Sequence, residues 1–367
     1  MKKITIIGNY GISKNVTDGG RIKIRLFFKL LSSDNICDIV DLDGWKKKIF
    51  NLIGKIRRAV KESDVILIMA GPKGCRFIIS LVNLFNKKLK KRIVYCPVGI
   101  GTIDYLLKKN KINNLVEIEN RIEKGLLNDR FILKELHKLD CIILENDYLK
   151  KIYDTLYKIA DKTFVLTNFR DEVIIKKDYN IKDKLNIVFA SRVCEEKGIF
   201  DLIEVVNQIN CNKTLIKLDI FGELQLSETE EILFNKLLNE NVQYKGTIMQ
   251  KDVISVIRNY DLFVLPTKYY GEGTPGALVE ALISGVPVLV SGYSQAKTLI
   301  SDNIDGFIFE FNNKLKLKEK LMFIHNNRIE IIERIGTCGQ EKSRIFLYEY
   351  NKDNFINLLF NKGGKAK

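Results

Sequence analysis

The chain has 367 residues, of which 46% are hydrophobic and 29% are charged. This length exceeds one typical domain and the composition excludes a disordered chain, so we expect two domains with separate cores. The 7 cysteines are dispersed and stand apart from the 2 histidines, a pattern that favours reduced thiols and argues against a structural metal site. The apolar runs are too short to span a membrane.

The net charge is +15, and almost all of the excess lies near the amino terminus. Residues 1–100 contain 21 Lys and Arg against 7 Asp and Glu, whereas residues 171–367 contain 26 against 27. A basic half of this kind indicates an acidic partner and carries no information about the fold.

From the amino terminus, short apolar runs alternate with helical stretches. We predict strands at residues 4–7, 36–40, 65–69, 93–96, 141–144 and 163–166, with helices between them that include 21–31 and 45–61. This alternation is typical of a parallel sheet covered by helices.

The same pattern restarts after a charged segment, residues 170–184, which we expect to be a linker. Strands are predicted at 186–190, 215–221, 242–245, 262–265, 286–290 and 307–309, with helices near 199–209, 228–240, 251–259 and 275–284. The sequence therefore predicts an α/β fold of two Rossmann-like domains, residues 1–170 and 171–343, that face each other across a cleft. Residues 344–367 are expected to form a carboxyl-terminal helix that packs back across the domains.

Residues 270–287 are the most informative segment, because a loop there follows a predicted strand and opens a helix. Thr274 is expected to cap this helix and Pro275 to lie in its first turn. Unpaired N–H groups at a helix start attract phosphate, and the small residues Gly276 and Ala277 let a ligand approach the backbone. We expect a phosphate site here.

Two glutamates belong to the same segment. Glu272 lies in the loop and Glu280 in the helix, so one carboxylate can accept hydrogen bonds from sugar hydroxyls while the other binds a ribose. The alternative is a solvated loop acid and an ordinary helical glutamate.

A second loop follows the strand at 186–190 and presents Arg192 and Lys197 before the next helix. An arginine fork and a lysine charge suit phosphate oxygens and stabilise a departing diphosphate. Taken alone, such a loop is more often a solvated basic turn.

Together these segments resemble the retaining glycosyltransferases of the GT-B fold, family 4, also called glycosyl transferases group 1. The motifs follow that family's order: Ala-Ser-Arg-Val-x-x-Glu-Lys-Gly at 190–198, Asp-Ile-Phe-Gly-Glu at 219–223, Tyr-Lys-Gly at 244–246, the segment at 270–287 and Asp-Gly-Phe at 305–307. The resemblance implies that Arg192 and Lys197 hold the donor diphosphate, Glu280 holds the ribose, and Glu272 contacts the donor sugar. The further residues that it places in the nucleotide site are Gly222, Thr274, Pro275, Gly276 and Ala277.

The amino-terminal half resembles the family less closely. Asp18-Gly19-Gly20-Arg21 resembles its glycine loop, which lies against the donor phosphate and sugar, and residues 99–101 resemble its acceptor side. Many members have an active-site histidine in this half. The candidate here, His137, lies in a charged helical stretch and is predicted to be structural, which leaves the acceptor-side catalytic residue unassigned.

The resemblance implies transfer of a hexose or N-acetylhexosamine with retention of configuration. The donor would be a nucleotide sugar, with UDP favoured over GDP, and the acceptor a glycan or a polyprenyl-linked sugar in bacterial surface polysaccharide synthesis. No metal or other cofactor is implied, and Asp41-Leu-Asp43, which matches a metal motif of another glycosyltransferase fold, is predicted to be a coincidence.

The basic half predicts a cytoplasmic protein that binds the anionic inner face of the membrane peripherally. A helix at 45–60 has apolar residues at helical spacing between lysines and arginines, which fits either membrane contact or an ordinary core-facing stripe. The alternative functions are a sugar-nucleotide epimerase of the same fold and a basic nucleic-acid-binding protein. The latter is disfavoured because the sequence contains no recognisable binding module.

Overall fold

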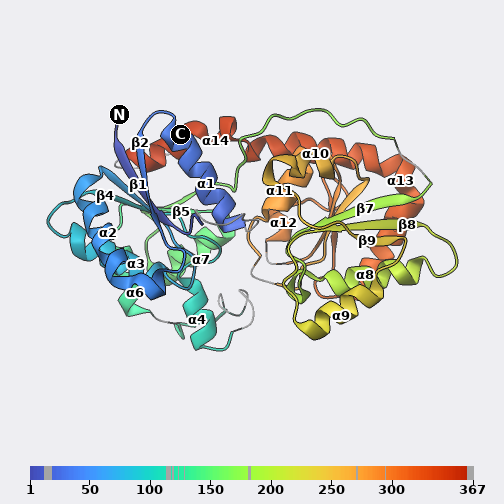
Figure 1. The fold of residues 1–367 in the computed structure, drawn as a ribbon, viewed down its shortest axis with the longest axis horizontal. Coiled ribbons are helices and arrows are strands. Elements are labelled where there is room, and N and C mark those ends of the chain that lie inside the picture. Colours follow the sequence, from blue (N-terminus) through green and yellow to red (C-terminus); the bar gives the residue numbers. More distant parts are fainter. Residues whose placement is uncertain are drawn as a thin grey trace. The chain divides into compact units, whose positions relative to one another are not determined.

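A computed structural model describes residues 1–11, 19–112, 117, 120–122, 124–127, 129–180, 183–269, 272–293 and 295–361 (Figure 1). The chain divides into two compact units, each with its own parallel sheet. Unit 1 contains Met1–Asn168 and Tyr348–Lys367, and unit 2 contains Phe169–Leu347. The chain thus passes between units at 168/169 and 347/348, near the predicted divisions at 170/171 and 343/344.

Unit 1 has a six-stranded sheet in the order β2-β1-β3-β4-β5-β6. The strands are β1 (Lys3–Gly8), β2 (Ile36–Asp41), β3 (Val65–Met69), β4 (Arg92–Tyr95), β5 (Cys141–Leu144) and β6 (Thr163–Val165). Every residue of the central strand β3 is buried, as expected for a parallel strand that helices cover on both faces.

The helices of unit 1 come from both ends of the chain. They are α1 (Gly19–Ser32), η1 (Trp45–Lys48), α2 (Ile49–Glu62), α3 (Cys75–Asn86), α4 (Ile103–Lys109), α6 (Arg130–Leu136), α7 (Asp147–Tyr157) and α14 (Tyr348–Phe360). Phe355 of α14 packs against Phe27 with ring centroids 4.6 Å apart. The Arg92 guanidinium donates to two carbonyls near the end of α14, at 2.8 and 2.9 Å, so the carboxyl-terminal helix completes the core of unit 1.

The predicted helix at 45–61 is two elements, because the backbone of Lys48 leaves the helical region between η1 and α2. The apolar stripe of α2 (Leu52, Ile56, Ala59 and Val60) is buried, and α2 contacts β1, β2 and α3. The stripe therefore faces the core of unit 1, while Arg57 and Arg58 are exposed.

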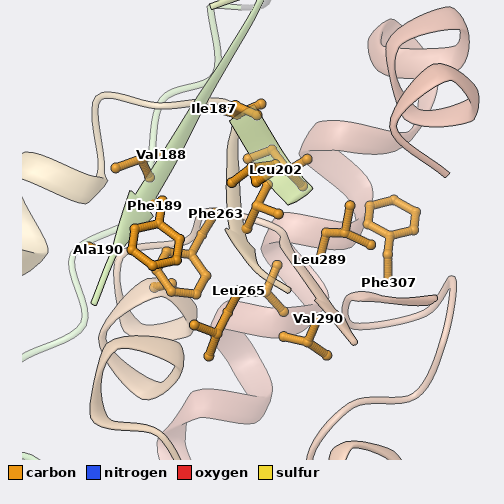
Figure 2. Packing of buried hydrophobic residues seen from close by; sticks show 14 of the residues in the cluster. Ile187, Val188, Phe189, Ala190, Leu202, Phe263, Leu265, Leu289, Val290 and Phe307 are labelled. Carbon is orange, nitrogen blue, oxygen red and sulfur yellow. The ribbon is translucent and has the colours of Figure 1, made fainter. Parts of the chain in front are cut away.

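Unit 2 has the strand order β12-β11-β10-β7-β8-β9. The strands are β7 (Leu185–Ala190), β8 (Ile216–Phe221), β9 (Val242–Tyr244), β10 (Leu262–Leu265), β11 (Val288–Ser291) and β12 (Phe307–Phe309). Figure 2 shows apolar side chains of β7, β10, β11 and β12 in the core with Leu202.

The helices of unit 2 lie between these strands and after them. They are η2 (Glu195–Lys197), α8 (Ile199–Ile209), α9 (Glu228–Leu237), η3 (Gln250–Asp252), α10 (Val253–Ile257), α11 (Gly276–Ile283), α12 (Ala296–Leu299), α13 (Lys314–Lys342) and η4 (Ser343–Phe346). The prediction of two parallel α/β domains is confirmed, and each predicted strand is present within two residues of its expected bounds.

The segment at 170–184 differs from the predicted linker, because its described residues belong to unit 2. Lys177 is buried and donates to the Arg258 carbonyl, and the Tyr179 hydroxyl donates to the Gly285 carbonyl at 2.6 Å. These contacts attach the segment firmly to the helices of unit 2, so its charged composition is misleading.

Candidate active site

Two of the predicted site loops meet at one edge of the sheet of unit 2. β7 and β10 are parallel neighbours, so the loops that follow them leave the sheet at the same edge, where ligands bind in such folds. The Lys268 N–H donates to the Glu196 carbonyl at 2.8 Å, and Thr267 donates to the same carbonyl at 3.2 Å. The two loops are therefore joined directly.

Lys197 and Glu272 form an ion pair at this edge. Lys197 Nζ lies 2.5 Å from Glu272 Oε2, and the side chains are 8% and 12% exposed. Thr267 Oγ1 also lies 3.2 Å from the same carboxylate oxygen. Burial raises the pKa of the neighbouring Tyr293 far above its usual range, and the charge of Glu272 adds to this rise. The sequence predicted both charged residues but not their pairing.

Two glycines at this edge have backbone conformations that require glycine. Gly198 has φ +74°, and a Cβ there would lie 1.9 Å from the Pro266 carbonyl oxygen. Gly222 has φ +143°, and a Cβ there would lie 1.7 Å from the Ser191 carbonyl oxygen. Gly222, which the family resemblance places in the nucleotide site, thus has a packing role whether or not it touches a ligand.

Arg192 follows β7 and is half-buried. Its Nη1 donates to Gln225 Oε1 at 3.1 Å, and Gln225 in turn donates to Glu223. The structure therefore pairs Arg192 with the loop after β8, whereas Lys197 is paired with Glu272.

Helix α11 begins one residue later than predicted. Its N-cap is Pro275, with φ −61° and ψ 130°, and this residue makes no side-chain capping hydrogen bond. The expectation that Thr274 caps it is wrong, because the extended backbone of Pro275 keeps Thr274 outside the helix. Thr274 is buried, while Gly276 and Ala277 are half-buried in the first turn, where N–H groups lack partners within a helix. An anion site there fits this geometry.

Glu280 is buried inside α11, with 4% of the residue exposed. Its Oε1 accepts hydrogen bonds from Arg170 Nε at 2.7 Å and from Gln250 Nε2 at 2.8 Å. No motif in the sequence assigns a role to Arg170 or Gln250. They lie 110 and 30 residues away along the chain, and no local pattern signals these contacts.

The residues predicted in unit 1 are only partly described. Asp18 lies outside the described residues, and so do Tyr270 and Gly271 of unit 2. Helix α1 begins at Gly19, so Gly19 and Gly20 lie in its first turn. A feature that the sequence did not reveal is the buried pair of Lys23 in α1 and Glu145 after β5, 2.8 Å apart. Both residues lie beside the carboxyl-terminal edge of this sheet.

Of two other residues singled out from the sequence, Asp41 has structural contacts and His137 is exposed. Asp41 accepts hydrogen bonds from the N–H groups of Tyr10 and Asp43 at 2.9 and 3.1 Å, so its carboxylate closes a loop. His137 is exposed at the carboxyl end of α6. The part of the chain that the structure describes holds no group of three or more His, Cys, Asp or Glu arranged to bind a metal.

Within the ranges given above, no helix is both long enough and apolar enough to cross a bilayer.

The sequence is similar to several curated glycosyltransferases. An uncharacterised glycosyltransferase of Methanocaldococcus jannaschii is 27% identical over 68% of this chain and 69% of its own length. CapM of Staphylococcus aureus, a capsular polysaccharide biosynthesis glycosyltransferase, is 24% identical over 69% and 59%. The N,N'-diacetylbacillosaminyl-diphospho-undecaprenol alpha-1,3-N-acetylgalactosaminyltransferase of Campylobacter jejuni is 26% identical over 40% and 37%. Three further relatives are matched over 60–65% of their length.

Solved structures share the fold of the chain. Sucrose-phosphate synthase from Thermosynechococcus elongatus has a TM-score of 0.74 at 15% identity, covering 98% of each chain. HepE of Anabaena in complex with UDP has a TM-score of 0.74 at 14% identity, covering 97% of this chain and 99% of that one. Residues 171–342, nearly all of unit 2, match the family described as glycosyl transferases group 1. This part of the chain is therefore similar to the glycosyl transferases group 1 family, and the fold of the chain is that of the GT-B glycosyltransferases.

Proposed function

We propose that the protein is a glycosyltransferase that moves a hexose or N-acetylhexosamine from a nucleotide sugar to an acceptor with retention of configuration. The observation that carries the proposal is the set of groups at one edge of unit 2. The Lys197–Glu272 pair and the first turn of α11 lie there, and Glu280 follows within the same helix. Such a set suits a diphosphate, a sugar and a ribose.

In the proposed reaction the donor phosphate leaves while the acceptor hydroxyl attacks from the same face of the sugar. The leaving phosphate oxygen takes the acceptor proton, so the protein needs no dedicated base. Its task is to position the donor and to stabilise the charge that grows on the diphosphate. Lys197 and Arg192 supply that stabilisation, since Lys197 has further N–H groups besides the one directed at Glu272.

The substrates are proposed from the relatives. The names of CapM and of the Campylobacter enzyme refer to capsular polysaccharide and to an undecaprenol-linked sugar, and HepE was solved with UDP. We therefore favour a UDP-sugar over a GDP-sugar as donor. The acceptor we favour is a glycan or a polyprenyl-linked sugar of bacterial surface polysaccharide synthesis.

A polyprenyl-linked acceptor would bring the protein to the cytoplasmic face of the membrane, and unit 1 is suited to that surface. Lys46, Lys47 and Lys48 of η1 are exposed, and the neighbouring Phe50 is 87% exposed. Because the apolar stripe of α2 faces the core, the proposed binding is electrostatic and peripheral.

A donor screen with purified protein tests the activity. We expect one sugar donor to release its nucleotide when acceptor is present, and we expect EDTA not to reduce this release. NMR of the product should show that the anomeric configuration of the donor sugar is retained. Conversion of the donor without an acceptor would indicate the epimerase instead. An inverted product would remove the retaining mechanism, and sequence-selective nucleic-acid binding without transfer would overturn the proposal.

A further inference from the structure

The two oxygens of the Glu280 carboxylate have different surroundings. Oε1 accepts from both Arg170 Nε and Gln250 Nε2. Among the residues that the structure describes, no hydrogen-bond donor reaches Oε2. The carboxylate is therefore held through one oxygen, and the other remains able to accept a hydrogen bond from a ligand.

Arg170 is itself held in place on several sides. Its backbone N–H donates to the Phe346 carbonyl at 2.8 Å, and its Nη1 donates to the Phe169 carbonyl at 3.1 Å. The residue is 5% exposed. A Cβ on Gly276 would lie 2.1 Å from Arg170 Nη2, so a side chain at residue 276 would displace the guanidinium from its present position against α11.

This arrangement has an energetic consequence for Glu280. A buried carboxylate is stable in its ionised form only when it is paired and hydrogen-bonded, and Arg170 meets both needs. Two donors on one oxygen also fix the rotation of the carboxylate plane, so little conformational freedom remains to be lost when Oε2 accepts a hydroxyl.

We propose that Arg170 is a positioning residue of the donor site: together with Gln250 it fixes Glu280 so that Oε2 accepts a hydroxyl of the nucleotide ribose. The inference rests on the proposed function, in which a nucleotide donor binds unit 2. The competing explanation is an ion pair that only stabilises unit 2.

Selectivity for the ribose hydroxyls separates the two explanations. Binding of UDP, 2′-deoxy-UDP and 3′-deoxy-UDP to the full chain is measured by calorimetry, with GDP and its deoxy analogues in parallel. Because the hydrogen bond is made to a charged carboxylate, we expect the wild-type protein to bind the analogue that lacks the bonded hydroxyl about tenfold or more weakly than UDP. In Arg170→Met this preference should fall to within about threefold, and Arg170→Lys should be intermediate.

The control is Lys342→Met, which breaks the 2.7 Å ion pair with the buried Asp305 elsewhere in unit 2 and should keep the full preference. If Arg170→Met does not fold, Gln250→Leu removes the second donor to Oε1 and should lower the preference at least about threefold. Retention of the full hydroxyl preference in the folded variants, even with weaker binding of all nucleotides, would overturn the inference alone. Absence of nucleoside diphosphate binding by the wild-type protein would overturn the proposed function and this inference with it.

Discussion

A substitution at Glu280 affects two groups, because the carboxylate expected to bind ribose also neutralises Arg170 inside unit 2. Glu280→Ala should abolish transfer, but it should also lower the free energy of unfolding by about 3–5 kcal/mol, since it removes the carboxylate that is paired with a buried guanidinium. Glu280→Gln, which keeps an acceptor oxygen, should lose transfer with a smaller loss of stability. Urea unfolding and a transfer assay measure both effects, and unchanged donor affinity in Glu280→Gln would contradict the ribose role.

Arg192 and Lys197 should respond differently to truncation although both are expected to act on one diphosphate. Arg192→Ala should slow turnover at least about tenfold with little change in stability, because its partner Gln225 lies at an exposed contact. Lys197→Ala should slow turnover as well and also destabilise unit 2, because Glu272 loses its partner. Steady-state kinetics of the double variant should show less than additive losses. Independent, fully additive losses would mean that the two cations do not share a ligand.

The chemical types of the site residues were easier to predict than their contacts. Strand ends and motif order identified Lys197, Glu272 and Glu280 as site candidates, because these residue types follow buried strands at a sheet edge. The contacts that orient them could not be predicted. Arg170 lies 110 residues from Glu280 in a segment whose charge suggested a solvated linker, and only the packing of unit 2 brings the two together.

Gly222 determines how closely the loop after β8 approaches the loop after β7. Gly222→Ala would place a methyl group 1.7 Å from the Ser191 carbonyl oxygen, so we expect it to cost about 2–4 kcal/mol of unfolding free energy from overpacking and backbone strain. Gly246→Ala is the matched control. Gly246 also has a positive φ but has no atom within 4 Å of the added Cβ, so about 1 kcal/mol is expected. Equal losses in chemical denaturation would show that steric approach is not the cause.

The strands were easier to predict from the sequence than the longest helix. The strands were predictable because parallel strands buried on both faces are short continuous apolar runs between helical patterns. The 29-residue helix α13 was not predicted. It contains Gly336 and Gly339, and glycine usually weakens or ends a helix. Here a Cβ on these two residues would lie 2.6 Å from the Gly285 carbonyl oxygen and 2.8 Å from that of Asp305, so the glycines permit close packing inside unit 2.

For the molecule as a whole, the uneven charge predicts salt-sensitive membrane binding. Liposome sedimentation should show binding that requires anionic lipid and weakens at high salt. Charge reversal at Lys46, Lys47, Lys48, Lys87, Lys88, Lys90 and Lys91 should abolish it. Reversal of Lys213, Lys236 and Lys251, which are exposed on unit 2, is the control and should have little effect. Equal binding to neutral vesicles, or no binding at low salt, would favour a soluble acceptor.

The position of α14 after unit 2 in the sequence has a consequence for biosynthesis. Unit 2 is a single continuous stretch, Phe169–Leu347, whereas unit 1 also needs residues 348–360. During translation, the second unit in the sequence is therefore the first whose residues have all been made. Until Phe355 emerges from the ribosome, Phe27 cannot make its ring contact with Phe355. The core of unit 1 therefore remains incomplete until that stage of synthesis. Apolar surface that is exposed in an incomplete nascent domain makes the chain prone to aggregation.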